Sequence, residues 1–131
     1  MTTELHYLVA VSAFTSILWV PYILNRLLSG PGLVHEVGYP SEDTVLSPWG
    51  ARLKKAHGNA LENLAVFAPL VLVAHIAELS NETTVLAASV YLWARVAHAL
   101  AYVFAVPWLR TLAFTAGFFC QATFAYLLLT S

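Results

Sequence analysis

Four long apolar stretches, separated by short polar segments, dominate the sequence. A helix needs about 20 residues to cross the hydrocarbon core of a bilayer, and each stretch is long enough. The pattern predicts helices over approximately residues 5–28, 48–78, 83–106 and 108–129. We therefore expect an all-α, integral membrane four-helix bundle with up-down topology, formed by residues 1–131 as a single transmembrane domain.

Helix-breaking and helix-starting residues mark the ends of these stretches. Ser29-Gly30-Pro31-Gly32 ends the first one, and the polar segment that follows, up to Ser47, is expected to be a loop at the water interface. The acidic residues of this segment are Glu36, Glu42 and Asp43. Ser47-Pro48 is a typical helix start, with a capping residue before a proline at the first helical position. Pro21 lies inside the first stretch, where a proline can kink a transmembrane helix without ending it.

The composition agrees with a membrane protein. The chain is 60% hydrophobic and 10% charged, whereas a soluble domain carries about 25% charged residues. The net charge of -1 provides no basic field for nucleic acid, so we expect no nucleic-acid partner. The single cysteine, Cys120, cannot form an internal disulfide and is interpreted as a small buried apolar residue. The first stretch has neither a basic leader nor a cleavage site, so we interpret it as a retained span.

The basic residues indicate the orientation in the membrane. With four spans, the first and third loops share one side, and the termini share the other side with the second loop. The cations at the ends facing the first and third loops are Arg26, Arg52, Lys54, Lys55 and Arg110. Glu4, Glu78 and Glu82 mark the other side, which has no Lys or Arg. The positive-inside rule therefore predicts cytoplasmic first and third loops and both termini outside.

Two ionisable residues, Glu62 and Arg95, lie deep within the predicted spans. An unpaired charge at the centre of a bilayer costs about 2.5–3.5 kcal/mol on insertion scales. Such residues normally face the interior of a bundle and form pairs. We therefore predict that Glu62 and Arg95 form an ion pair.

Further polar residues extend this pair into a continuous seam. On the second predicted helix, Arg52, Lys55, Asn59 and Glu62 are spaced three or four apart and so share one face, which His57 and Asn63 flank. On the third, Arg95, His98 and Tyr102 share a face in the same way, and Arg110 opens the fourth helix. The seam begins at the predicted cytoplasmic end and descends into the bundle.

Two interpretations of the seam remain open at this point. Polar contacts between transmembrane helices commonly serve only to hold helices together, at about 0.6 kcal/mol each. Several cations converging at one end instead favour a polar anionic ligand, because arginine grips carboxylates in a bidentate manner. A metal site of His57, His98 and Glu62 is conceivable, but no metal-binding motif is present and the neighbouring cations would repel a metal ion. We expect no metal.

Three segments resemble the motifs of the MAPEG family, the membrane-associated proteins in eicosanoid and glutathione metabolism. Residues 52–63, Arg-Leu-Lys-Lys-Ala-His-Gly-Asn-Ala-Leu-Glu-Asn, are similar to the family's second-helix signature, approximately Arg-x-x-Arg-Ala-His-x-Asn-x-x-Glu-Asn. Residues 95–102, Arg-Val-Ala-His-Ala-Leu-Ala-Tyr, resemble its third-helix motif, and Arg110-Thr111 resembles the start of its fourth helix. The resemblance covers the whole chain in length, span count and motif order.

This resemblance implies a homotrimer that binds glutathione as co-substrate between neighbouring protomers, at the cytoplasmic end. The expected glutathione-site residues or their supports are Arg52, Lys55, His57, Asn59, Glu62, Arg95, His98 and Tyr102. By the same resemblance, Arg110 is expected to be catalytic and to hold the thiol of glutathione as thiolate. A hydrophobic second substrate would reach the site from the surrounding membrane lipid.

Departures from the family pattern bear on the substrate. Lys55 replaces an arginine, Thr111 replaces a serine and Phe114 replaces a tyrosine, while Gly58 follows the signature histidine. These changes favour a bacterial-type member in the inner membrane, with both termini in the periplasm. The predicted function is a glutathione-dependent transferase or peroxidase that acts on a hydrophobic electrophile or lipid hydroperoxide. The alternative is a non-catalytic lipid-binding or scaffold protein, or a structural subunit of a membrane complex.

Overall fold

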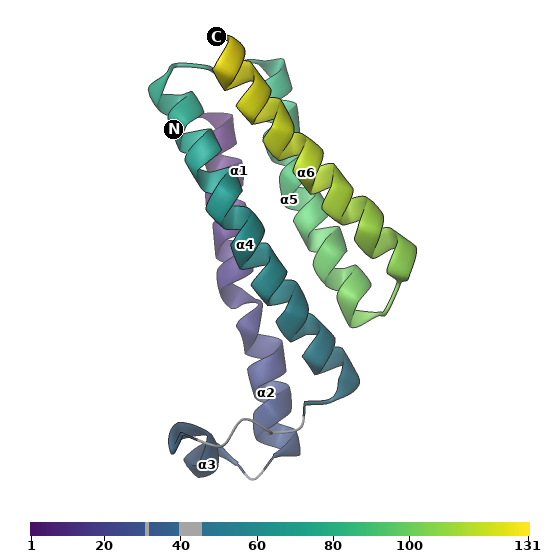
Figure 1. Ribbon diagram of the computed structural model, residues 1–131. Helices are drawn as coiled ribbons and strands as arrows, with labels where there is room; N and C mark the ends of the chain where they lie inside the picture. The colour runs from purple at the N-terminus through teal and green to yellow at the C-terminus, as the bar shows by residue number, and fades with distance from the viewer. Residues whose placement is uncertain (31, 40–45) are drawn as a thin grey trace.

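The computed structural model describes residues 1–30, 32–39 and 46–131, and these residues form helices and no strand. The helices are α1 (Thr3–Ile17), α2 (Trp19–Ser29), α3 (Leu33–Val37), α4 (Pro48–Ile76), α5 (Glu82–Val103) and α6 (Pro107–Thr130). Four segments are long and apolar enough to cross a membrane, namely Thr3–Ser29, α4, α5 and α6. They run up and down beside one another, with both termini at one end of the bundle (Figure 1). The predicted fold class is confirmed.

The first span is interrupted near its middle. Helix α1 ends at Ile17, and α2 begins at Trp19 after Leu18, whose backbone N–H bonds to the carbonyl of Thr15, three residues back. Pro21 explains the interruption, because it lacks an N–H and its ring presses on the carbonyl of the residue four positions earlier. That residue is Ile17, the last residue of α1. The two helices follow one another as one kinked span (Figure 1).

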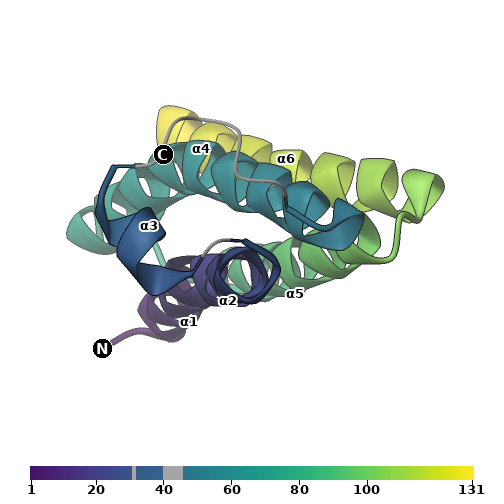
Figure 2. The ribbon, with the colours of Figure 1, turned by 90° about the horizontal axis from the view of Figure 1, so that it is seen from below.

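The first loop contains a short helix that the sequence did not predict. Helix α3 lies outside the bundle, beside the end of α2, in both views (Figures 1 and 2). The Arg26 Nε atom lies 2.7 Å from Glu36 Oε2 and so ties α3 to α2. Pro31 of the predicted breaker, and Glu42 and Asp43, lie outside the described residues.

Side chains at the helix starts fix how α4 and α5 begin. The Asn25 amide of α2 donates to Ser47 Oγ at 2.8 Å and accepts from the Ser47 backbone N–H at 2.9 Å, just before Pro48 starts α4. Gly50 allows this close approach, because a Cβ there would lie 2.6 Å from Asn25 Oδ1. Asn81 caps α5 through a reciprocal capping box with Thr84.

The connection between α5 and α6 starts earlier than expected. Helix α5 ends at Val103, whereas the sequence suggested an end near residue 106. Ala105 has a left-handed backbone, with φ of 56°, and the Val106 N–H bonds back to the carbonyl of Ala101 at 2.8 Å. This turn satisfies a carbonyl at the end of α5 and reverses the chain before Pro107.

The apolar core is divided into two clusters along the bundle. The larger one contains Phe67, whose ring stacks on Tyr91 at 3.7 Å between centroids and meets Phe124 edge-on. The smaller one gathers Leu53, Ala60 and neighbouring residues nearer the start of α4. Of the polar seam, the buried Arg95 and His98 lie on α5 between the residues of the two clusters, so the fold places these two polar groups inside the bundle.

Candidate functional site

Two adjoining recesses lie where the start of α4 meets the end of α5 and the start of α6. One has a volume of about 230 Å³ and is lined by Arg52, Lys55, Ala101, Tyr102, Ala105, Val106, Pro107 and Arg110. The other has a volume of about 270 Å³ and is lined by Asn59, His98, Tyr102, Arg110, Thr111 and Phe114. Tyr102 and Arg110 line both. The structure therefore brings Arg52, Lys55, Asn59, His98, Tyr102 and Arg110 together from three helices.

Arg52 has a structural contact in addition to its place in the recess. Its Nε donates to the Tyr102 carbonyl at 2.8 Å, and its Nη2 donates to the Val103 carbonyl at 3.0 Å. Carbonyls in the last turn of a helix lack partners within the helix, and the helix dipole favours a cation there. Arg52 therefore fastens the end of α5 to α4 while keeping its positive charge at the wall of the recess.

Arg110 stands at the junction of the two recesses. Its Cζ atom lies 5.2 Å from the centroid of the Tyr102 ring, which is cation–π geometry. Its guanidinium makes no hydrogen bond or ion pair with any side chain in the described part of the chain. The neighbouring Thr111 hydroxyl donates to its own helix, to the Pro107 carbonyl at 3.3 Å. The exposed guanidinium of Arg110 is thus available to an anion.

Arg95 lies behind the second recess and is only 2% exposed. Its Nη2 lies 2.7 Å from Asn59 Oδ1, to which it donates, and 3.3 Å from His98 Nδ1. The Nε and Nη1 atoms are buried without a hydrogen-bond partner among the described residues. Arg95 therefore holds in place two side chains, those of Asn59 and His98, that line the recess.

The predicted ion pair between Glu62 and Arg95 is wrong for this chain. Glu62 is exposed, and no ion pair joins it to Arg95 among the described residues. The buried face of α4 runs through Ala60 and Phe67 and places position 63 inside the bundle. Glu62 lies about 100° around the helix from that position and faces outward.

His57 also lies away from the recesses. Its Nδ1 is 2.8 Å from the hydroxyl of Tyr22, and the two rings are 5.8 Å apart. The contact joins α2 to α4. Of the expected site residues, His57 thus makes a packing contact within the chain, whereas Glu62 lies on its outer surface.

A polar layer deeper in the bundle was not predicted from the spacing of polar residues. Gln121 of α6 donates from Nε2 to the Asn63 carbonyl at 3.1 Å, and Asn63 Nδ2 donates to the Asn59 carbonyl at 2.9 Å. Gln121 stands alone as an amide in the uncharged stretch from Thr111 to Ser131. That isolation is the signal that could have indicated an interior position.

The site has a clear chemical character. Arg52, Lys55 and Arg110 bring positive charge to one end of the bundle, with the Asn59 amide and the Tyr102 hydroxyl nearby. Such a set can bind an anionic ligand through charge-assisted hydrogen bonds. No group of three or more His, Cys, Asp or Glu side chains that could hold a metal lies within the part of the chain described by the structure.

Fold and site together define a class: a small, multi-pass integral membrane protein with a basic recess at one end of a helical bundle. The model of the MAPEG family matches residues 5–130, nearly the whole chain. The chain therefore belongs to the MAPEG family. No curated protein matches it.

Proposed function

We propose that this protein is a membrane-bound, glutathione-dependent transferase or peroxidase that acts on a hydrophobic electrophile or a lipid hydroperoxide. Membership of the MAPEG family supports a glutathione-related role. The observation that carries the proposal is the position of Arg110, an exposed guanidinium at the junction of two recesses that also contain Arg52 and Lys55. A recess built only to hold helices together would not need these converging cations.

The donor set fits glutathione, which carries carboxylates, an amino group and a thiol. Arg52 and Lys55 would receive the carboxylates, and Asn59 and Tyr102 offer neutral hydrogen bonds. Glu62, exposed on the outer face of α4, would receive the amino group. Arg110 would stabilise the thiolate over the thiol, because a nearby guanidinium favours the anionic form, which is the nucleophile.

We further propose that the site is shared between the protomers of a homotrimer. Both recesses are open on the surface of a single chain, and Glu62 faces outward rather than into its own bundle. A neighbouring protomer would close the recesses and bring the outward carboxylate against the ligand. The same proposal places the basic end in the cytoplasm and both termini in the periplasm of a bacterial inner membrane.

A second candidate function is lipid binding without catalysis. An apolar groove of about 340 Å³ lies between α5 and α6, and Leu86, Val90 and Phe119 are among its lining residues. A groove of this kind suits an acyl chain. It would serve either as a path for the hydrophobic substrate or as a binding site in a scaffold protein.

Binding and turnover of glutathione test the proposal directly. The purified protein in mild detergent would be titrated with glutathione and assayed with a panel of electrophiles and lipid hydroperoxides. Lys55 lines the recess, whereas its exposed neighbour Lys54 does not, so they form a matched pair of variants. We expect Lys55→Gln to weaken glutathione binding by about tenfold and Lys54→Gln to leave it nearly unchanged.

Three outcomes are informative. Saturable glutathione binding with turnover supports the enzyme. Glutathione binding with no turnover of any electrophile or hydroperoxide in the panel favours the scaffold function. Failure of the trimer to bind glutathione contradicts both the enzyme and the assignment of the recess.

A further inference from the structure

A buried carboxylate lies at the opposite end of the bundle from the basic recess. Glu4, in the first turn of α1, is only 4% exposed. Its Oε1 accepts hydrogen bonds from Ser80 Oγ at 2.8 Å and from Thr84 Oγ1 at 2.5 Å. These bonds tie α1 to Ser80 in the turn between α4 and α5 and to Thr84 in the first turn of α5.

The second oxygen of the same carboxylate is unsatisfied. Glu4 Oε2 is buried and has no hydrogen-bond partner among the described residues. A buried ionised oxygen without a donor is unfavourable, because the group has lost its hydration without replacement. A ligand that brings an N–H donor and a positive charge would remove this deficit.

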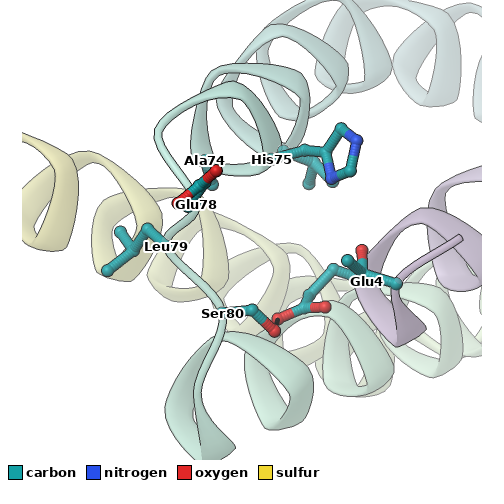
Figure 3. Close-up of a pocket in the computed structure, with 8 residues that line it drawn as sticks. Glu4, Ala74, His75, Glu78, Leu79 and Ser80 are labelled. Atoms are coloured by element: carbon teal, nitrogen blue, oxygen red, sulfur yellow. Dashed lines mark hydrogen bonds between the residues drawn. The ribbon is translucent and has the colours of Figure 1, made fainter.

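Glu4 lines a pocket that has room for such a ligand. The pocket has a volume of about 230 Å³, and its walls are Thr2, Glu4, Val71, Ala74, His75, Glu78, Leu79 and Ser80. No Lys or Arg is among these residues. Figure 3 shows the Glu4 side chain extending from α1 toward Ser80, with His75 and Glu78 coming from the end of α4.

Glu78 adds a second acidic group at an unusual backbone position. It has a φ of 55°, just after α4, where the Leu79 N–H bonds back to the Ala74 carbonyl at 2.9 Å. This left-handed position at the end of a helix is usually taken by glycine or asparagine. A glutamate there places another carboxylate at the pocket, so the pocket is acidic on two sides.

We propose that this pocket binds a primary ammonium group carried on a short carbon chain, with Glu4 as its counter-ion. The N–H donors would satisfy Oε2, and Val71, Ala74 and Leu79 would contact the carbon chain. A metal ion is a poorer match, because the described residues contain no cluster of three or more His, Cys, Asp or Glu ligands. The proposal is independent of glutathione binding at the other end.

Two sources supply this chemistry at a membrane surface: the head group of an aminophospholipid and a free amine in the water. The free-amine arm measures thermal unfolding of the purified protein in detergent with ethanolammonium or tetramethylammonium at equal ionic strength. Both ions carry one positive charge, but tetramethylammonium has no N–H donor. The lipid arm compares nanodiscs of phosphatidylcholine with nanodiscs that also contain phosphatidylethanolamine.

We expect a saturable rise in the unfolding midpoint with ethanolammonium, with phosphatidylethanolamine, or with both. A rise with ethanolammonium alone indicates that the ligand is a free amine. A rise with phosphatidylethanolamine alone indicates that it is the lipid head group. Glu4→Gln keeps an oxygen for Ser80 and Thr84 but loses the charge, so it should weaken binding by at least about tenfold. Glu82→Gln is the matched control, because Glu82 is exposed and does not line the pocket.

The proposal is overturned if primary and quaternary ammonium ions act equally and the two lipid compositions also act equally. It is overturned as well if the effect persists undiminished in Glu4→Gln. Should that variant fail to fold, Glu78→Gln at the exposed second carboxylate takes its place, with a several-fold loss of binding expected. The comparison of ethanolammonium with tetramethylammonium on the unaltered protein tests the binding of a primary ammonium group without any variant.

Discussion

The guanidinium of Arg95 is held by the amide of Asn59, with 2.7 Å between Nη2 and Oδ1, and no carboxylate contacts it among the described residues. This contact joins α5 to α4 at the inner wall of the basic recess. The cation is therefore buried with a neutral partner, and part of its hydrogen-bonding capacity is unused. The position of Asn59 depends on it.

Two substitutions of Asn59 should show whether its oxygen acceptor stabilises the fold, because one removes the acceptor and the other keeps it. Asn59→Leu leaves the buried Arg95 without its shortest hydrogen bond and should lower the free energy of unfolding by about 1–3 kcal/mol. Asn59→Asp keeps an oxygen acceptor and adds an opposite charge, so its cost should be smaller. Unfolding in mixed detergent, followed by circular dichroism, measures both. Equal losses in the two variants would argue against the contact.

Two glycines of α4 should respond to alanine in opposite ways. A Cβ added at Gly58 would meet no atom within 4 Å, so Gly58→Ala should stabilise the helix by up to about 1 kcal/mol. At Gly50 a Cβ would lie 2.6 Å from Asn25 Oδ1, so Gly50→Ala should displace the amide that holds Ser47 and cost about 1–3 kcal/mol. Thermal unfolding midpoints of the two variants test the opposite signs.

Arg52→Lys should loosen the end of α5. A lysine cannot reproduce the fork of Nε and Nη2 that holds the Tyr102 and Val103 carbonyls. We expect faster amide hydrogen exchange in the last turn of α5 and a loss of about 1 kcal/mol in stability. Lys55→Arg, a charge-conserving change at an exposed site, is the control and should leave the exchange unaltered.

Glu62→Gln should distinguish a ligand contact from a fold contact. Glu62 is exposed, and no ion pair within the described residues involves it, so the free energy of unfolding should change by less than about 0.5 kcal/mol. Glutathione binding to the assembled protein should weaken severalfold, since the proposed partner of the amino group is lost. Unchanged binding would remove Glu62 from the proposed site.

Hydropathy and helix-breaking residues were sufficient to predict the four spans, because the bilayer fixes their length and composition. The break near Leu18 was harder to predict, since the same proline chemistry leaves α4 continuous through Pro69. Helix α3 has too few residues to produce a periodic pattern. These features depend on local packing, which is not encoded in average hydropathy.

The grouping of polar residues on helix faces predicted that Arg52, Lys55 and Asn59 of α4 would gather with residues of α5 at one end of the bundle, but it wrongly included Glu62. It did not predict their partners. A rotation of about 100° per residue separates Asn63, which faces the bundle, from Glu62, which is exposed, and Arg95 contacts Asn59 rather than Glu62. The contact of His57 with Tyr22 depends on how α2 packs against α4, which no spacing within one helix can show.

The central claim is that Arg110 stabilises the thiolate of bound glutathione. Its most direct test is the thiolate absorbance of glutathione bound to the protein, titrated against pH in the unaltered chain and in Arg110→Lys. Lysine keeps the positive charge but is a compact ammonium on a different stem, so it should place that charge poorly against the sulfur. We predict that the thiolate signal shifts to higher pH and turnover falls. Glutathione affinity should change little at a pH low enough to keep the bound thiol protonated, and should fall at higher pH, where the lost interaction with the thiolate appears in binding. An unchanged titration together with unchanged turnover would contradict the thiolate role and favour the scaffold function.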